Sequence, residues 1–419
     1  MRRLFLLPLL GLAIGLLPAL TGCGLFTRRP LVLCTDRPEL ASFVEQFNAR
    51  QSDLRVHLRY QQAPEEALHR NQGVDLLIST RLAGSGEARA LESLEDLLRP
   101  NRLNREDFYA PLLAAGAPER RQVLLPLSFC LPAVLFLPYN LAETPPNLGI
   151  PLEFLRRNGG QYNQRVRDAL VREGFSPLWD PAFLPAAAEL GGARFHEESA
   201  GSVEWNAPAL EEAIAYLRDW VQTTNGGTLA ERAFADRYLY LPPGRLLDEK
   251  RIQFYLLRSC DLLRALEEQK EEADFRWLAG PEKVLVGDEI LFAGIPRSSR
   301  RKAQARAFLL WLFQGETQTR LLEIGRRQRL GVFGIAGGFS GLKSVNELAF
   351  PQYYPRLIGR IPPEELLQVP GPLPQAWPEI KTQVLIPWLR EAVSGSSTPA
   401  DLEERLKAAR LARSRKQAF

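Results

Sequence analysis

Strand-like and helix-like hydrophobic patterns alternate along the chain from residue 31. Residues 31–34 form a short apolar run, and the apolar side chains of 40–47 then recur at helical spacing. Residues 54–60 alternate apolar and polar positions, as a half-buried strand does, and 73–80 form another apolar run. This alternation predicts an α/β fold built on a mostly parallel sheet with helices on both faces.

Prolines interrupt a long apolar run at 124–140. A single helix cannot hold three internal prolines, so the run predicts two extended segments that meet near Ser128-Phe129-Cys130. An extended passage of this kind suits a crossing between two lobes, with a hinge at the crossing. The chain after Thr144 is helix-rich, which indicates that a second lobe begins there.

Capping signals mark two helices in the second half of the chain. Asn206 is a predicted N-cap, and Thr398 with Asp401 resembles a capping box. Further elements are predicted from apolar runs: strands at 252–257 and 284–295, the second interrupted at 287–289, and a helix at 303–313.

Length and composition restrict the class of protein. A chain of 419 residues is too long for one ordinary core, and 45% hydrophobic with 24% charged residues excludes a disordered chain and a multi-span membrane protein. The formal charge of +4 is not a nucleic-acid-binding footprint. Four cysteines are too few for a disulfide scaffold, and the three histidines lie far apart, so we expect neither a metal site nor a cofactor.

The N-terminus has the pattern of an export signal. Arg2-Arg3 precedes an apolar run at 4–20, and Leu20-Thr-Gly-Cys23 resembles a bacterial lipobox. The run is short for a membrane span and is broken by glycines and a proline. We therefore predict a signal peptide at 1–22, lipidation of Cys23 and a tether at 23–30, which would anchor an exported protein to the cell envelope.

Motifs of common enzyme classes are absent from the sequence. It contains no Gly-x-Ser-x-Gly elbow, no P-loop and no His-Glu-x-x-His, and the glycine-rich stretch at 331–338 does not open a recognisable phosphate-binding helix. Paired carboxylates such as Asp288-Glu289 also occur in glycosidases, but no partner motif accompanies them here. We expect a protein that is not an enzyme.

Several of these segments resemble the extracellular solute-binding proteins of ABC importers, in the group that includes maltose-binding protein. The resemblance is carried, in order along the chain, by 39–60, 73–80, 125–133 and 292–314. It implies a two-lobed periplasmic-binding-protein fold of type II, with three crossings between lobes that are joined by a hinge. The implied first lobe is 31–139 plus 284–341, and the implied second lobe is 140–283 plus 342–419.

The resemblance also implies a function without chemistry. Such a protein closes on a ligand, here a carbohydrate or sugar derivative, and delivers it as a monomer to ABC permease subunits. Two alternatives stay open: a sensor or surface lipoprotein on the same fold, and a binder of an anionic sugar phosphate or glycerol phosphate ester. The second alternative rests on Arg37 and Arg258, because arginines suit a phosphate.

Candidate ligand contacts are taken from strand ends, including 34–37 and 79–81, because ligands of open α/β sheets bind there. Phe129 could equally well pack in the core as contact a ligand. Trp205 could equally well be a buried strand residue. Cys34, Cys130 and Cys260 form an odd set, so at least one thiol stays unpaired within the chain. The candidates are Asp36, Arg37, Asp75, Ser79, Phe129, Trp205, Arg258, Ser259, Asp288 and Glu289.

Overall fold

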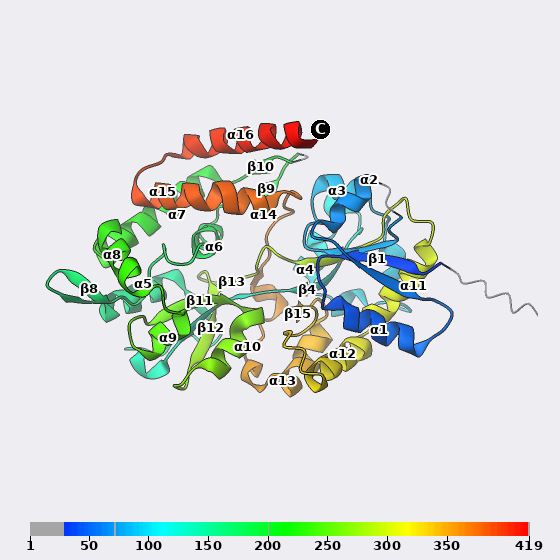
Figure 1. Ribbon diagram of the computed structural model, residues 1–419, viewed down its shortest axis with the longest axis horizontal. Coiled ribbons are helices and arrows are strands. Elements are labelled where there is room, and N and C mark those ends of the chain that lie inside the picture. The colour runs from blue at the N-terminus through cyan, green and yellow to red at the C-terminus, as the bar shows by residue number, and fades with distance from the viewer. Residues whose placement is uncertain (1–28, 71–72, 200, 418–419) are drawn as a thin grey trace, which may run out of the picture.

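The computed structural model describes residues 29–70, 73–199 and 201–417. Two lobes lie side by side in Figure 1, and each is built on its own sheet. We call the part on the sheet that begins with β1 the first lobe and the part on the other large sheet the second lobe. The predicted leader and the predicted lipidation site, Cys23, lie outside the described residues. None of the described helices is both long and apolar enough to cross a membrane.

The first lobe is organised around a six-stranded sheet in the order β15-β4-β14-β3-β1-β2. β1 pairs in parallel with β2 and with β3, while β14 runs antiparallel to both of its neighbours. The strands are β1 (Leu31–Thr35), β2 (Val56–Tyr60), β3 (Leu76–Ser79), β4 (Leu125–Phe129), β14 (Leu291–Gly294) and β15 (Phe339–Ser340).

Helices cover this sheet with the apolar faces that the sequence predicts. The buried residues of α1 are Leu40, Phe43, Val44 and Phe47, the spacing of one helical face. Phe47 packs edge-on against Phe308 of α11, with ring centroids 4.9 Å apart. The helices are α1 (Leu40–Arg50), α2 (Ala67–Arg70), α3 (Ser85–Arg89), α4 (Ala110–Ala115), α11 (Lys302–Leu312) and α12 (Gly315–Arg327), with a single turn η1 (Pro64–Glu66).

The second lobe is built on a sheet in the order β11-β5-β12-β13-β16, with β6 paired to β12. β5 runs antiparallel to both β11 and β12. Two small hairpins, β7–β8 and β9–β10, complete it. The strands are β5 (Pro132–Phe136), β6 (Gly149–Pro151), β7 (Gln164–Val166), β8 (Ala169–Arg172), β9 (His196–Glu197), β10 (Val203–Glu204), β11 (Phe254–Arg258), β12 (Asp274–Ala279), β13 (Val284–Leu285) and β16 (Leu367–Gln368).

Ten further helices and three π-helical turns are described after β5. They are α5 (Leu152–Tyr162), α6 (Phe183–Leu190), α7 (Ala207–Asp219), α8 (Thr228–Tyr238), α9 (Pro243–Asp248), α10 (Ser259–Glu268), α13 (Phe350–Tyr353), α14 (Trp377–Ile380), α15 (Ile386–Ser394) and α16 (Pro399–Gln417), with η6 (Trp220–Thr224), η7 (Val345–Ala349) and η10 (Lys381–Leu385). The predicted caps are confirmed: the Asn206 side chain accepts from Ala209 N, and Asp401 accepts from Thr398 N at 2.6 Å.

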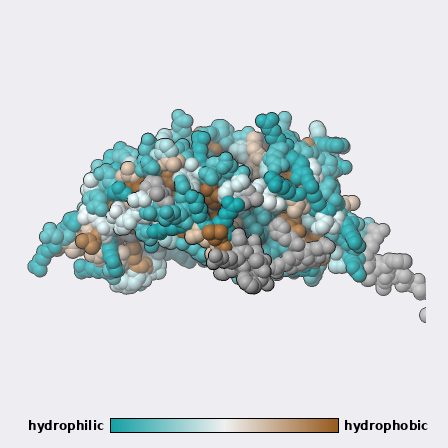
Figure 2. Space-filling model, turned by 90° about the horizontal axis from the view of Figure 1, so that it is seen from above, coloured by the Kyte–Doolittle hydropathy of each residue, from teal (hydrophilic) through white to brown (hydrophobic). Residues whose placement is uncertain are grey.

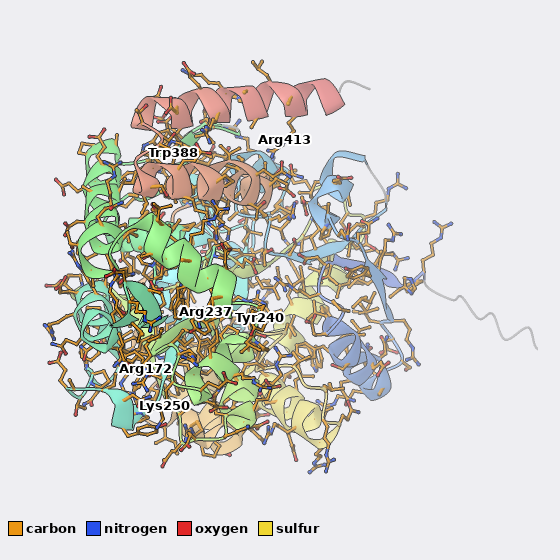
Figure 3. The ribbon with its side chains drawn as sticks, turned by 60° about the vertical axis from the view of Figure 1, so that its left-hand side comes forward. Arg172, Arg237, Tyr240, Lys250, Trp388 and Arg413 are labelled. Atoms are coloured by element: carbon orange, nitrogen blue, oxygen red, sulfur yellow. The ribbon has the colours of Figure 1, made fainter. Side chains whose placement is uncertain are left out.

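The C-terminal helix α16 lies along the top of the molecule (Figure 1). Beneath it, the buried Trp388 of α15 donates from Nε1 to the carbonyl of Thr398 at 3.0 Å. Figure 3 labels Trp388 together with Arg413, whose guanidinium lies 3.5 Å from the carbonyl of Ala376. The face that is seen from above is mostly hydrophilic, with hydrophobic residues scattered over it (Figure 2).

The chain passes between the two sheets at β4–β5, at β13–β14 and at β15–β16. The predicted break at Ser128-Phe129-Cys130 is confirmed, because β4 ends at Phe129 and β5 begins at Pro132. The α/β class is confirmed too, but the expectation of mostly parallel sheets is wrong. In the first sheet, β14 starts at the edge where β1 and β3 end, so it runs antiparallel to β3. In the second sheet, β11 and β12 both run antiparallel to β5.

Candidate functional site

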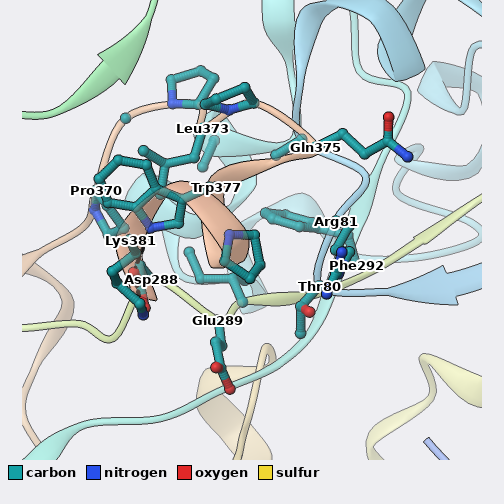
Figure 4. A pocket seen from close by; sticks show the side chains of 17 residues that line it. Thr80, Arg81, Asp288, Glu289, Phe292, Pro370, Leu373, Gln375, Trp377 and Lys381 are labelled. Carbon is teal, nitrogen blue, oxygen red and sulfur yellow. Dashed lines mark hydrogen bonds and ion pairs between the residues drawn. The ribbon is translucent and has the colours of Figure 1, made fainter. Parts of the chain in front are cut away.

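A pocket lies between the lobes, at the edge of the first sheet where β1 and β3 end and β14 begins (Figure 4). Pairing of Phe292 with Ser79 fixes this arrangement, because it brings residues 80–81 beside 288–290. The second lobe contributes the proline-rich segment 370–378 and Lys381. The pocket holds about 550 Å³ of empty space, part of it open to solvent.

Arg81 links the two lobes across this pocket. Its Nη1 lies 2.7 Å from Oε1 of Glu379 in α14 and 3.8 Å from Oε1 of Glu65 in η1. Glu65 is fully buried, and burial raises the pKa of its carboxyl to about 7. Its Oε1 also accepts from Gln375 Nε2 at 3.4 Å. With this pKa, the Glu65 carboxyl can hold a proton near neutral pH and is then able to donate as well as accept.

Glu289 lies between an arginine from each lobe. Its Oε2 is 3.8 Å from Arg37, which follows β1, and 3.5 Å from Arg258, which ends β11. Arg258 also approaches Asp261 at 3.5 Å. Burial raises the pKa of the neighbouring Asp36, although the charge of Arg37 opposes this. The structure thus brings together four of the predicted residues, Asp36, Arg37, Arg258 and Glu289.

Asp288 contacts two side chains of the second lobe that line the pocket. Its carboxylate accepts from Trp377 Nε1 at 2.5 Å and from Lys381 Nζ at 2.7 Å. Trp377 is 6% exposed, and its ring lines the pocket (Figure 4). Because both oxygens of Asp288 are engaged by these two donors, its carboxylate orients the indole ring.

Three buried polar atoms next to the pocket have no hydrogen-bond partner among the described residues. They are Oδ1 of Asp36, Nε of Arg37 and Oε2 of Glu65. Buried polar groups are seldom left unpaired, because each unsatisfied group is unfavourable by about 1–3 kcal/mol. Two acceptors and one donor at one sheet edge are suited to the hydroxyl groups of a polar ligand.

Four of the predicted ligand contacts instead stabilise the first sheet and the crossing between β4 and β5. Asp75 lies at the amino end of β3, away from the pocket, and accepts from Val32 N and Ser299 Oγ. Ser79 is buried and its Oγ accepts from Arg81 N at 3.3 Å. Phe129 packs in the core against Tyr109 and Phe339. Ser259 is buried, and its Oγ accepts from Leu131 N at 3.1 Å.

Trp205 lies behind the pocket rather than in its wall. It packs against Phe195 with ring centroids 6.5 Å apart, and Phe195 in turn packs against Trp377 at 5.7 Å. The tryptophan whose ring lines the pocket, together with Phe292, is therefore Trp377, which the sequence pattern did not select. The alternation of prolines at 370, 372, 374 and 378 around this tryptophan is the signal that could have found it.

Arg81, Gln375 and Lys381 in the pocket wall, and Glu65 beside Arg81, are further residues that the sequence did not predict. Arg81 falls at a strand end that the sequence analysis marked, whereas Glu65 lies in a single turn with no periodic pattern. Among the described residues, no group of three or more His, Cys, Asp or Glu side chains is arranged to hold a metal ion.

Comparisons with known proteins place this geometry in a fold class. No protein-family model matches the sequence, and no curated protein matches it. Solved structures of sugar-binding proteins do match in fold. The sugar-binding protein MalE from Xanthomonas citri has a TM-score of 0.64 at 13% identity, over 90% of this chain and 96% of that one.

Two further structures agree. The cyclic alpha-maltosyl-1,6-maltose binding protein from Arthrobacter globiformis has a TM-score of 0.59 at 15% identity, over 91% of this chain and 96% of that one. The maltose-maltodextrin binding protein of Alicyclobacillus acidocaldarius has a TM-score of 0.59 at 14% identity, over 90% and 100%. The chain has the two-lobed periplasmic-binding-protein fold that these structures share.

Proposed function

We propose that the protein is the substrate-binding lipoprotein of an ABC transporter, which captures a carbohydrate between its two lobes and delivers it to a membrane permease. The observation that carries the proposal is the pocket itself. An oriented indole ring faces a sheet edge that carries unpaired buried hydrogen-bonding atoms. Sugars present apolar ring faces and a rim of hydroxyls, so one site with both features is suited to them.

The charges around the pocket favour a neutral ligand over an anionic one. Its four cationic side chains, Arg37, Arg81, Arg258 and Lys381, are each within 4 Å of a carboxylate. A phosphate would have to displace these partners or add charge beside Asp36 and Glu65. A sugar phosphate or glycerol phosphate ester is therefore the second candidate ligand, and a sensor or surface lipoprotein on the same fold is the alternative role.

The proposed protein has no catalytic step. Asp288 and Glu289, the paired carboxylates, are engaged with Lys381 and Trp377 and with two arginines respectively. That engagement supports a binding role for both. We also propose the lobe division 31–139 plus 284–341 and 140–283 plus 342–419. Near its borders, β5 and β13 fall within the ranges of the first lobe but belong to the sheet of the second lobe, where each pairs with β12.

The test of the carbohydrate proposal is calorimetric titration with a ligand panel. The panel contains maltotriose and mannotriose as neutral glycans and sugar phosphates as anionic ones, each at low and high salt. We expect a neutral glycan to bind with an affinity that hardly changes with ionic strength, because no net charge is neutralised. Binding of the sugar phosphates alone, weakened by salt, would support the anionic alternative.

The lipid anchor is tested separately. Expression in bacteria that are fed a labelled fatty acid should label the parent protein and not the Cys23→Ala variant. A Cys23→Ala protein that still takes up the label would exclude this residue as the attachment site.

A further inference from the structure

Two cysteines face each other where the first crossing enters the second lobe. β11 and β5 pair antiparallel as far as Arg258 opposite Pro132. The pairing continues by one residue, because Ser259 N donates to the carbonyl of Leu131 at 2.8 Å and Leu131 N donates to Ser259 Oγ. Cys130 directly precedes Leu131, and Cys260, in the first turn of α10, directly follows Ser259. The two thiols perturb each other's pKa, so the sulfurs lie close together, while Cys260 Sγ also donates to Asp261 Oδ2 at 3.5 Å.

This placement makes a disulfide between the two residues sterically plausible. Each cysteine adjoins one member of the hydrogen-bonded pair Leu131 and Ser259, and a disulfide spans Cα atoms about 4.4–6.8 Å apart. Both residues are partly exposed, whereas Cys34 is buried. Cys34 differs on both counts: it is fully buried in β1, and its thiol donates to Gln61 Oε1 at 3.0 Å.

We propose that Cys130 and Cys260 form a modification site, at which a disulfide-bearing oxidant converts the two thiols into an intramolecular disulfide. The site lies next to Arg258 and Glu289, at the crossing on which lobe movement depends.

The surroundings assign different roles to the two sulfurs. The hydrogen bond from Cys260, a further one from Ser259 and the positive charge of Arg258 hold the pKa of Cys130 below its ordinary value. The pKa of Cys260 is raised by its hydrogen bond with Cys130 and by burial. Since the thiolate is the nucleophile in thiol–disulfide exchange, Cys130 is the attacking residue and Cys260 resolves the intermediate.

The reaction balances in two exchanges. Cys130 Sγ, as thiolate, attacks one sulfur of the oxidant and expels the other as a thiolate, which takes up the proton that Cys130 lost. Cys260 Sγ then loses its proton and attacks Cys130 Sγ in the mixed disulfide, which expels the second oxidant thiolate. Two cysteine thiols are oxidised, and the oxidant disulfide is reduced to two thiols.

Oxidation changes what Cys130 contacts. In the thiol form its Sγ donates to the carbonyl of Gly337 at 3.2 Å, in the segment that leads into β15 of the first lobe, while its own carbonyl accepts from Gly287 N. In the disulfide form this S–H donor is lost, and Cys130 is bonded to the first turn of α10 in the second lobe. The modification thus transfers one contact at the crossing from the first lobe to the second.

The experiment is peptide mapping of the full chain, produced with its own leader and isolated without reductant. Free thiols are blocked with N-ethylmaleimide under denaturing conditions, and the digest is analysed by mass spectrometry before and after treatment of the native protein with oxidised glutathione. We expect a peptide containing Cys130 linked to one containing Cys260 in most of the treated protein, and Cys34 blocked as a free thiol.

The matched variant is Cys34→Ser, which should leave the Cys130–Cys260 link unchanged. The proposal is overturned if both Cys130 and Cys260 still carry N-ethylmaleimide after treatment, if they end as separate glutathione adducts, or if the link involves Cys34. Because the decisive result comes from the parent chain, it does not depend on whether a Cys130 or Cys260 variant folds.

Discussion

Arg81 of the first lobe and Glu379 of the second lobe form an ion pair of 2.7 Å directly across the candidate pocket. The lobes also meet where the backbone N–H of Ser85 donates to Glu197 Oε2 of β9 at 2.5 Å. These contacts exist only when the lobes are together, so they favour the closed arrangement over an open one.

Glu379→Gln should shift the protein toward the open arrangement. The substitution removes the charge that pairs with Arg81, and a partly exposed pair of this kind contributes about 0.5–1 kcal/mol. We expect a larger radius of gyration in small-angle X-ray scattering of the free protein. Glu323→Gln is the control, since Glu323 pairs with Arg327 within α12 and makes no contact between lobes. Equal scattering curves for the parent and Glu379→Gln would contradict the role of this pair.

Trp377→Ala should weaken binding of a neutral glycan, whereas Trp205→Ala should not. Loss of the ring that lines the pocket removes a stacking contact of about 1.5 kcal/mol, which corresponds to about a tenfold loss of affinity. Both tryptophans pack against Phe195, so the pair separates ligand contact from core packing. Calorimetry measures the effect, and thermal unfolding shows whether each variant is folded.

Trp377→Phe refines the same test. The substitution keeps an aromatic ring but removes the Nε1–H group that donates a hydrogen bond to Asp288. Affinity between those of the parent and Trp377→Ala is expected. If Trp205→Ala weakens binding more than either Trp377 variant does while remaining folded, the pocket has been assigned to the wrong tryptophan.

Stability should fall as pH rises because two carboxyl groups are buried in the second lobe. Burial raises the pKa of Glu173 to about 9 and that of Glu231 to about 7. Between the unfolded pKa and these values the folded state holds protons that the unfolded state has released, so each group lowers stability by about 1.4 kcal/mol per pH unit. Both act from about pH 5 to 7, and Glu173 acts alone up to about pH 9.

Glu173→Gln isolates this effect. Its stability relative to the parent should increase with pH in urea unfolding, and the exposed Glu212→Gln should show no such trend. A difference between Glu173→Gln and the parent that is the same at acidic and alkaline pH would refute the assignment.

Phe129→Ala should destabilise the fold by about 3–5 kcal/mol, the range for a buried phenylalanine. Phe129 is 2% exposed and lies between Tyr109 and Phe339, so its role is packing at the crossing. Phe129→Leu preserves most of the apolar volume and should leave ligand affinity unchanged. Calorimetric titration of Phe129→Leu measures its ligand affinity. A large loss of affinity in this folded variant would show that Phe129 contacts the ligand.

Local patterns predicted these helices, strands and caps well, because the residues that determine each of them lie close together in the sequence. The helix of 40–50, the Asn206 cap and the break after Phe129 all follow from nearby residues. Strand-end reasoning also placed Asp36 and Arg37 at the edge of the first sheet where β1 ends. Glu289 reaches the same edge because it precedes β14, which runs antiparallel to β3. The antiparallel entry of β14 was not predictable from its own residues, because the direction of a strand depends on where the chain crosses.

The second-lobe wall of the pocket could not be predicted in the same way. Trp377 and Lys381 contact Asp288 although they lie 89 and 93 residues from it in the sequence. A local sequence pattern cannot predict a contact between residues so far apart in the chain. Trp205 and Trp377 both pack on Phe195, and only the packing of the lobes decides which ring meets the pocket.

The most direct test of the central claim is mass spectrometry of what the protein carries when it is isolated from its own cells under native conditions. The account predicts a noncovalently bound neutral oligosaccharide, released on unfolding and depleted in Trp377→Ala but not in Trp205→Ala. A bound peptide or metal ion in its place, or an oligosaccharide retained equally by both variants, would contradict it.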